Sequence, residues 1–201
     1  MASARPIAPR PARLPPRVGV LRTRDFEAAG VNRVKLGRLV AEGAIERVGR
    51  GLYTAPSAKV TEHHTLVEAS VRVRAGVVCL LSALRFHKLS TQSPHEVWIA
   101  IGVKARKPAP DWPPLHVVRF SGAALTHGAE THTIEGVAVR ITSPAKTVAD
   151  CFKYRNKIGI DVAIEALTEY RRRRASIDEL MKAAKVDRVA VVIRPYLEVI
   201  A

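Results

Sequence analysis

A glycine-bounded hairpin follows two short helix patterns near the start of this chain, and this order restricts the fold more than any other feature. Residues 45–48 and 52–55 are two short predicted strands, each beginning with an apolar residue, on either side of Gly49-Arg50-Gly51. Glycines at 49 and 51 give the backbone the freedom that a tight turn needs. Because a side chain at a hairpin tip faces solvent, packing does not account for Arg50. We infer that Arg50 meets something negatively charged.

Two helices are predicted before this hairpin. Thr23 is expected to cap the first helix, which stops at Gly30. Asn32 is expected to cap the second helix, which Gly43 terminates. The order of helix, turn, helix and β-hairpin predicts a winged helix-turn-helix over residues 18–57.

The remaining residues, 58–201, predict a larger mixed α/β domain. Ser143-Pro144 and the capping box Ser176 to Glu179 are typical helix starts. Helices are expected at residues 61–73, 77–86, 144–154, 161–174, from 177 onward, and at 187–200 with an interruption near Pro195. Strands are expected at 96–103, 115–120, 131–134 and 137–142, and the last two form a hairpin with the two-residue turn Glu135-Gly136. The fold class is therefore α+β, an N-terminal winged helix-turn-helix followed by a mixed α/β domain.

The charge of the chain indicates a polyanionic partner. The formal net charge is +15 and the isoelectric point is near 10.6. Residues 1–60 contain 12 Lys and Arg against four Asp and Glu, so the charge per residue is highest in the first unit. Residues 1–17 carry five prolines and four arginines and are expected to form a flexible cationic arm. Nucleic acid is the partner that such a balance most often indicates.

The second predicted helix, residues 33–42, has a face suited to a DNA major groove. Leu36, Leu39 and Val40 share the face that would pack on the small domain, and Arg38 lies almost opposite. Cations on such an outer face can reach guanine edges or phosphates, and a small apolar side chain can contact a thymine methyl group. The predicted DNA-contact residues are Thr23, Arg24, Asn32, Arg33, Val34, Lys35 and Arg38 in the helices and Arg47 and Arg50 in the wing.

No motif in the sequence predicts catalysis, a cofactor or a metal site. The seven histidines have no metal-binding spacing, and His63-His64 are expected to be solvated side chains near a helix start. No phosphate-binding glycine loop or cluster of carboxylates occurs. Cys79 and Cys151 are expected to be buried free thiols. The chain is therefore expected to be a cytoplasmic protein without enzymatic activity, and no run of roughly 18 apolar residues predicts a membrane span.

The run Arg171 to Arg174 ends a predicted helix and has two interpretations. It is either a solvated last turn, where the helix dipole favours cations, or a second anionic contact to DNA or an acidic protein. Glu169 is expected to pair with Arg173 across one helical turn. Trp98 is expected to be packed, because it lies in an apolar strand.

The stretch "GVLRTRDFEAAGVNRVKLGRLVAEGAIERVGRGLYTAP" resembles the N-terminal winged helix of the AbiEi antitoxin family. Later segments also resemble this family, most specifically "SPAKTVAD" at residues 143–150. Family members have a full first helix where this chain has Pro11, Pro15 and Pro16, which disfavour a helix interior.

The resemblance implies a transcriptional repressor of its own toxin–antitoxin operon that binds promoter inverted repeats in double-stranded DNA. It also implies an AbiEi-like C-terminal antitoxin domain that opposes an AbiEii-like nucleotidyltransferase toxin, without requiring a stable complex. The protein is then expected to be a monomer in solution or a cooperative pair on DNA. Three alternatives stay open: a protein-interaction module, a stand-alone repressor, and a nuclease fused to a winged helix.

Overall fold

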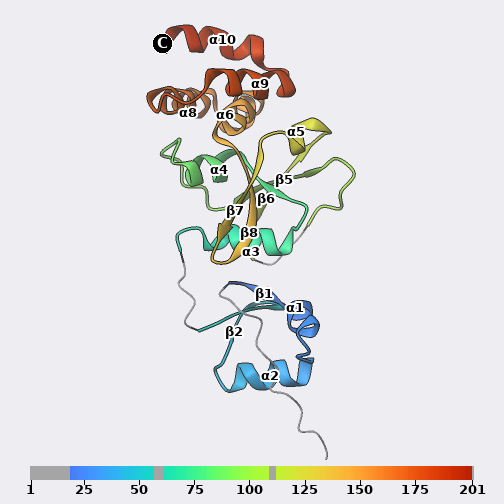
Figure 1. Ribbon diagram of the computed structural model, residues 1–201. Coiled ribbons are helices and arrows are strands. Elements are labelled where there is room, and N and C mark those ends of the chain that lie inside the picture. The colour runs from blue at the N-terminus through green and yellow to red at the C-terminus, as the bar shows by residue number, and fades with distance from the viewer. Residues whose placement is uncertain (1–18, 57–60, 109–111, 201) are drawn as a thin grey trace, which may run out of the picture. The chain divides into compact units, whose positions relative to one another are not determined.

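The computed structural model describes residues 19–56, 61–108 and 112–200 (Figure 1). The chain divides into two compact units, Met1–Lys59 and Val60–Ala201. Helices and strands both contribute to the fold, as the predicted α+β class requires. The predicted arm, residues 1–17, lies outside the described residues.

The first unit has the predicted order of helix, turn, helix and hairpin. Its elements are β1 (Leu21–Arg22), α1 (Thr23–Ala28), α2 (Arg33–Ala41), β2 (Glu46–Gly49) and β3 (Leu52–Thr54). The sequence did not predict β1, which pairs antiparallel with β3 and completes a three-stranded sheet in the order β1-β3-β2. A strand of two residues is too short to show an alternating pattern.

A small apolar core holds the first unit together. Phe26, Val31, Leu36 and Ile45 are almost fully buried, and Leu39 and Val40 of α2 pack against them. The Phe26 ring meets the Tyr53 ring edge-on, with 5.7 Å between the ring centroids. Because Leu36, Leu39 and Val40 are the residues expected on the inner face of α2, the predicted orientation of this helix is confirmed.

The predicted cap of the first helix is wrong by one position. Arg22 is the N-cap of α1, and Thr23 is the first helical residue. The backbone N–H of Arg22 donates to the Asp25 carboxylate at 2.8 Å, which satisfies a donor at the helix start. The helix start is therefore stabilised by the Asp25 carboxylate, and not by the Thr23 hydroxyl that was expected to cap it.

The second unit has a five-stranded mixed sheet in the order β6-β5-β4-β8-β7. The strands are β4 (Val77–Val78), β5 (Val97–Gly102), β6 (Leu115–Phe120), β7 (Ala129–Ile134) and β8 (Val137–Thr142). The helices are α3 (His64–Arg72), α4 (Leu80–His87), α5 (Ala123–Thr126), α6 (Pro144–Lys153), α7 (Arg155–Ile158), α8 (Ile160–Arg172), α9 (Ile177–Asp187) and α10 (Ala190–Val199). Figure 1 shows α6, α8, α9 and α10 gathered at one end of this unit and α3 at the other.

Two predicted helix boundaries of the second unit are wrong. Residues 77–78 are strand β4 and not the start of a helix, because they pair with β5 and β8 in the middle of the sheet. The helix expected from Thr61 begins at His64. Thr61 instead donates from its backbone N–H and its hydroxyl to the Glu135 carboxylate, at 2.7 and 2.9 Å.

The interruption expected near Pro195 is also wrong, because α10 continues through this proline. Proline lacks an N–H and leaves the carbonyl four residues earlier without its helical partner. That residue is Val191, which is 82% exposed, so water can reach its backbone. The chain breaks earlier instead, at Arg188, which ends α9 with a left-handed φ of +60°.

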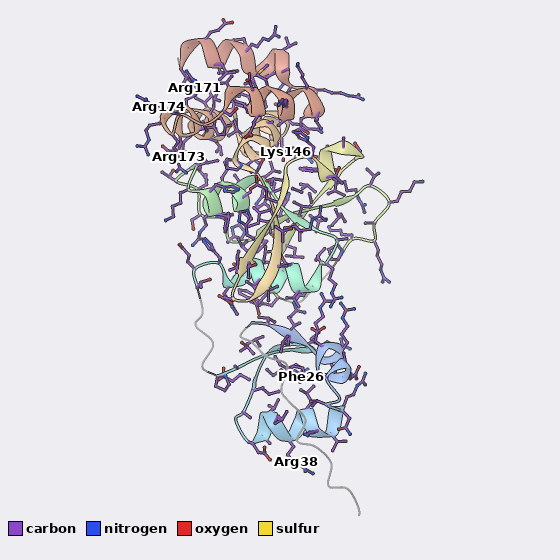
Figure 2. The ribbon with its side chains drawn as sticks, in the orientation of Figure 1. Phe26, Arg38, Lys146, Arg171, Arg173 and Arg174 are labelled. Carbon is purple, nitrogen blue, oxygen red and sulfur yellow. The ribbon has the colours of Figure 1, made fainter. Side chains whose placement is uncertain are left out.

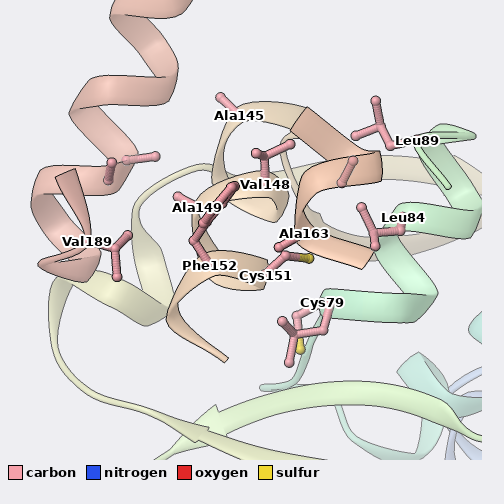
Figure 3. Close-up of a cluster of buried hydrophobic side chains, with 14 of the residues drawn as sticks. Cys79, Leu84, Leu89, Ala145, Val148, Ala149, Cys151, Phe152, Ala163 and Val189 are labelled. Atoms are coloured by element: carbon pink, nitrogen blue, oxygen red, sulfur yellow. The ribbon is translucent and has the colours of Figure 1, made fainter. Parts of the chain in front are cut away.

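The main core lies between the sheet and the helices of the second unit (Figure 3). Phe152 and Val148 of α6 are fully buried, as is Ala163 of α8. Both cysteines are buried free thiols, as predicted, and burial raises the pKa of each. Trp98 is 8% exposed and stacks on His116 with 3.7 Å between the ring centroids, so its predicted packing is confirmed.

A fully buried charge cluster joins α6 to α9. The Lys146 ammonium donates to the Asp150 carboxylate one turn later and to both oxygens of Asp187, at 3.3 and 3.0 Å. All three side chains have no exposed surface. Burial raises the pKa of Asp150, while Lys146 opposes that shift and Asp187 adds to it. Lys153, at 3.4 Å from Asp187, brings a second cation to the edge of the cluster.

Candidate nucleic-acid interface

The start of α2 is fixed by the predicted Asn32 cap. The side-chain oxygen of Asn32 accepts a hydrogen bond from the backbone N–H of Lys35 at 2.9 Å. At the other end, Gly43 has a φ of +68°, a left-handed conformation that glycine adopts without strain. Because Asn32 caps α2, it also positions Arg33, Val34 and Lys35 in the first turn of this helix, whether or not it contacts a partner itself.

The outer face of α2 carries the predicted cations. Arg33, Val34, Lys35 and Arg38 are all exposed, and the apolar Val34 side chain reaches 75% exposure. Figure 2 shows Arg38 on the side of α2 that faces away from Phe26 and the small core. Because the inner face is packed, this outer face is free to meet a partner.

An open hollow of about 450 Å³ lies along this face of α2. It is lined by Asn32, Val34, Lys35, Arg38, Leu39 and Glu42. Two residues of this surface were not among the predicted contacts. Glu42 adds one negative charge to it. Gly37 is exposed within α2, and a Cβ atom added there would point into open space. The missing side chain leaves the backbone of α2 accessible at this position, and a glycine inside a helix is the signal that could have revealed it.

Arg33 is held by a neighbour at the surface. Its Nε donates to the Glu27 carboxylate of α1 at 3.3 Å, and the two side chains are 83% and 45% exposed. Exposed ion pairs of this kind contribute about 0–1 kcal/mol. A phosphate group can therefore replace Glu27 as the partner of Arg33 at little cost.

The β2–β3 hairpin, which is the predicted wing, carries one arginine at its turn and another on the preceding strand. Arg50 and Gly51 form the turn between β2 and β3, and both Arg47 and Arg50 are exposed. Gly51 has a φ of +69°, which explains the need for glycine there. The Nε of Arg47 donates to the Gly49 carbonyl at 3.3 Å, so this side chain lies along the wing.

Thr23 connects the wing to the first helix. Its backbone N–H donates to the Gly51 carbonyl at 3.1 Å, and the residue is half-buried. Arg24, the next residue, is exposed. The structure thus places Thr23 beside the Arg50 turn and groups Asn32, Val34, Lys35 and Arg38 around one hollow, which Arg33 does not line. Within the part of the chain that the structure describes, no hydrogen bond or ion pair joins these two sets.

The basic run at the end of α8 is more constrained than a solvated turn. The guanidinium groups of Arg172 and Arg173 both pair with Glu169, with a shortest distance of 2.7 Å in each case, so the predicted Glu169–Arg173 pair is confirmed. These hydrogen bonds lower the pKa of Glu169 to about 2. Arg173 also donates to the carbonyls of His87 and Lys88 at the end of α4. Arg173 therefore links the end of α8 to the end of α4, a structural role that does not depend on a binding partner.

A loop of the second unit carries a cluster of exposed cations that was not among the predicted contact residues. Lys104, Arg106 and Lys107 are exposed after β5 and form no ion pair among the described residues. The Nη1 amino group of Arg119 lies within hydrogen-bonding distance of three carbonyls of this loop, those of Gly102, Val103 and Ala105, at 3.1, 2.5 and 2.9 Å, and its two hydrogens are shared among them. The sequence feature that could have revealed this cluster is the presence of three cations within residues 104–107.

The expected solvation of His63 and His64 is wrong. The His63 ring packs against Phe86, with 4.9 Å between the ring centroids, and His64 Nδ1 lies 2.7 Å from the Glu135 carboxylate. Although burial alone would raise the pKa of Glu135, hydrogen bonds from Thr61 and His64 lower it. The two histidines therefore attach the start of α3 to neighbouring elements.

Nothing in the described residues forms a metal-binding group of three or more side chains. The second unit holds a cavity of about 190 Å³ whose lining includes Arg85, Phe86, His95 and Trp112. None of the predicted DNA-contact residues lines this cavity. The buried Lys146 cluster has no exposed surface and cannot reach a substrate. None of the helices in the described parts of the chain is both long and apolar enough to span a membrane.

Comparison with solved structures finds a similar fold in a protein from Mycobacterium tuberculosis. The "Crystal structure of RV2827C protein from Mycobacterium tuberculosis" matches with a TM-score of 0.56 and 14% sequence identity. The match covers 83% of this chain and 66% of that chain. At this identity the likeness concerns the fold alone. No curated protein sequence gives a significant match.

A family model described as "Transcriptional regulator, AbiEi antitoxin" matches residues 16–56. This segment includes α1, α2 and the wing, and the match supports a role as a transcriptional regulator or antitoxin. The expected resemblance is confirmed for this part of the chain. Residues 16–56, which hold all nine predicted DNA-contact side chains, match the AbiEi antitoxin family of transcriptional regulators.

Proposed function

We propose that residues 18–57 bind double-stranded DNA at the promoter of the protein's own operon and repress transcription. The observation that carries this proposal is the outer face of α2. Its cations, Arg33, Lys35 and Arg38, and its exposed Val34 project from a helix whose other face is packed on the core. An exposed basic helix of this length suits a major groove, where arginine reads guanine and an apolar side chain contacts thymine.

The wing supplies the second part of the contact. Arg50 at the tip and Arg47 beside it can bind phosphates next to the groove. Phosphate contacts fix position and orientation, while base contacts on α2 select the sequence. Inverted repeats in the promoter would place two copies side by side, so the protein acts as a monomer in solution or a cooperative pair on DNA.

A promoter-binding titration tests this function. The Arg38→Ala/Arg50→Ala variant is compared with Lys182→Ala/Lys185→Ala, which removes two exposed cations from α9 of the other unit. We expect the first variant to lose at least 10-fold in affinity for a duplex of the upstream promoter, and the control to change far less. Equal losses in the two variants would mean that only total charge matters and would reject the groove contact.

We further propose that the chain is the antitoxin of an AbiEii-like nucleotidyltransferase toxin and acts in the cytoplasm. The family match supports an antitoxin role, and we assign this role to the second unit because the predicted DNA-contact residues all lie in the first. Co-expression with a nucleotidyltransferase encoded next to this gene tests the assignment. Restored growth with the Arg38→Ala/Arg50→Ala variant is expected. Failure of the wild-type chain to restore growth would leave a stand-alone repressor.

A further inference from the structure

The last helix of the chain exposes an apolar ridge. Val191 and Val199 of α10 are 82% and 85% exposed, and Pro195 between them is also exposed. Residues four apart lie on one face of a helix, so these three side chains form a continuous line. Single exposed apolar side chains are common on protein surfaces, but a row of three on one helix face indicates an interaction surface.

The opposite face of α10 is anchored in the core, which fixes the direction of this ridge. Ile193 is fully buried, and the Tyr196 ring packs against Phe152 of α6 with 5.3 Å between the ring centroids. The ridge therefore faces solvent because the other side of the helix is held. A change of rotation that buried Val191 would expose Ile193.

Two opposite charges border the ridge on one side. Arg194 and Glu198 are both exposed, are four residues apart, and form no ion pair within the described ranges of the chain. When two such helices lie antiparallel, Arg194 of each faces Glu198 of the other. In the same arrangement Val191 of each copy meets Val199 of the other, with Pro195 near the centre. The order of apolar and charged side chains along this face is thus complementary to itself, as a two-fold interface requires.

We propose that α10 binds α10 of a second copy of this chain, antiparallel about a two-fold axis near Pro195 and Tyr196. A helix of ten residues is about 15 Å long, so the pair buries less than the roughly 1,200 Å² of a standard stable interface. The pairing is therefore weak in dilute solution. It becomes populated where two copies are held close together, and adjacent operator half-sites would do this if the proposed function holds.

Cysteine cross-linking of the full chain tests the pairing and its direction without DNA. The variants are Val191→Cys and Val199→Cys, alone and mixed, oxidised with copper phenanthroline at high protein concentration. The native Cys79 and Cys151 are fully buried and do not interfere. Val103→Cys, at a 55% exposed position on the cationic loop, measures random collision. The probe is the yield of disulfide-linked dimer.

The antiparallel geometry makes a specific forecast. Two Val191 positions of an antiparallel pair lie about 12 Å apart along the helix axis, beyond the 4.4–6.8 Å Cα separation that a disulfide spans. We expect the mixture of Val191→Cys and Val199→Cys to cross-link at least fivefold faster than Val191→Cys alone or the Val103→Cys control. Equal rates in all samples, or faster cross-linking of Val191→Cys alone, would overturn the proposal.

Charge reversal adds an independent arm. In the same mixture, Arg194→Glu in both chains should reduce the yield to the Val103→Cys level, and Arg194→Glu/Glu198→Arg should restore it. Failure of the double reversal to restore cross-linking would also count against the pairing. Because no DNA is present, a chain that pairs but does not bind the promoter would retain this inference while the proposed function fails.

Discussion

Lys146 of α6 donates to both carboxylate oxygens of Asp187, 41 positions later in α9, at a site with no exposed surface. The same ammonium donates to Asp150 within α6. A buried cation between two carboxylates is stable only while all partners are present, because each lone charge is costly in the core. This cluster therefore makes the packing of α6 on α9 specific.

Replacement of Lys146 should lower the free energy of unfolding of the second unit more than replacement of the partly exposed Lys153. Lys146→Met leaves Asp150 and Asp187 buried without their main cation, and we expect a loss of about 3–5 kcal/mol in the free energy of unfolding. Lys153→Met, which removes only a half-exposed partner at 3.4 Å, should cost about 1 kcal/mol or less. Urea titrations followed by tryptophan fluorescence measure both, since Trp98 and Trp112 lie in this unit. Equal losses would contradict the assigned role of Lys146.

A triple apolar variant separates charge burial from packing. Lys146→Met/Asp150→Leu/Asp187→Leu removes every buried charge of the cluster except the edge cation Lys153. We expect it to recover much of the stability that Lys146→Met alone loses, because no buried carboxylate is left without a partner. A triple variant less stable than the single one would show that the cluster is stabilising in its own right.

His87 should make the stability of the second unit sensitive to mild acid. Its Nε2–H donates to the Thr142 carbonyl at 2.7 Å. Burial lowers the pKa of the ring from its ordinary 6.5; His132 and Arg173 add to this shift, while the Thr142 hydrogen bond and Glu130 oppose it without reversing it. The unfolded chain takes up a proton near pH 6.5, whereas the folded chain resists it. The stability is therefore full above pH 6.5 and falls as the pH drops below it.

The measurement compares unfolding free energies at pH 7.5 and 5.5. We expect a loss of up to about 1.4 kcal/mol per pH unit below 6.5 in the wild-type chain. His87→Gln keeps a side-chain N–H donor but cannot take up the proton, so its loss between the two pH values should be smaller. The same loss in both proteins would assign the acid sensitivity to other groups.

The exposed glycine of α2 should separate stability from DNA binding. A Cβ at Gly37 meets no atom within 4 Å in the protein, and alanine favours a helix by about 0.5–1 kcal/mol over glycine. Gly37→Ala should therefore slow amide hydrogen exchange in α2. If the backbone of α2 approaches DNA closely at this point, the same variant should bind the promoter more weakly. Slower exchange with unchanged affinity would place Gly37 outside the contact.

Arg38 and Arg50 should differ in how their loss depends on DNA sequence and salt. Arg38→Ala should weaken binding to the promoter by about 1–3 kcal/mol and relax the sequence preference, because it removes a base contact. Arg50→Ala should weaken binding to all sequences alike and reduce the salt slope by about one unit, because it removes a phosphate contact. Fluorescence anisotropy titrations on promoter and unrelated duplexes, at several salt concentrations, distinguish the two. Reversed behaviour would exchange the assigned roles of helix and wing.

Features that depend on neighbouring residues were predicted well from the sequence. The Asn32 cap, the bounds of β6 and the two-residue turn between β7 and β8 are all confirmed. Each rests on short-range chemistry: a side-chain acceptor beside a helix start, alternation along a strand, or a Glu-Gly turn. The outer face of α2 could likewise be inferred from helical periodicity alone.

Features that depend on distant residues were not predictable in the same way. Val77 and Val78 form a strand only because β5 and β8 lie on either side, and a short apolar run fits a helix equally well. The contacts of Thr61 and His64 with Glu135 span more than 70 positions. The Lys146 cluster was hidden for the same reason, since Asp187 belongs to a different helix.

The central strand β4 also divides the sheet into two parts. Within the described residues, Val77 and Val78 pair with β5 on one side, and Val78 pairs with β8 on the other, so this short strand is the backbone link between the β5–β6 pair and the β7–β8 hairpin. A bridge of two residues transmits little cooperativity between its neighbours. We therefore expect the β5–β6 pair and the β7–β8 hairpin to open separately, which their amide hydrogen exchange would show.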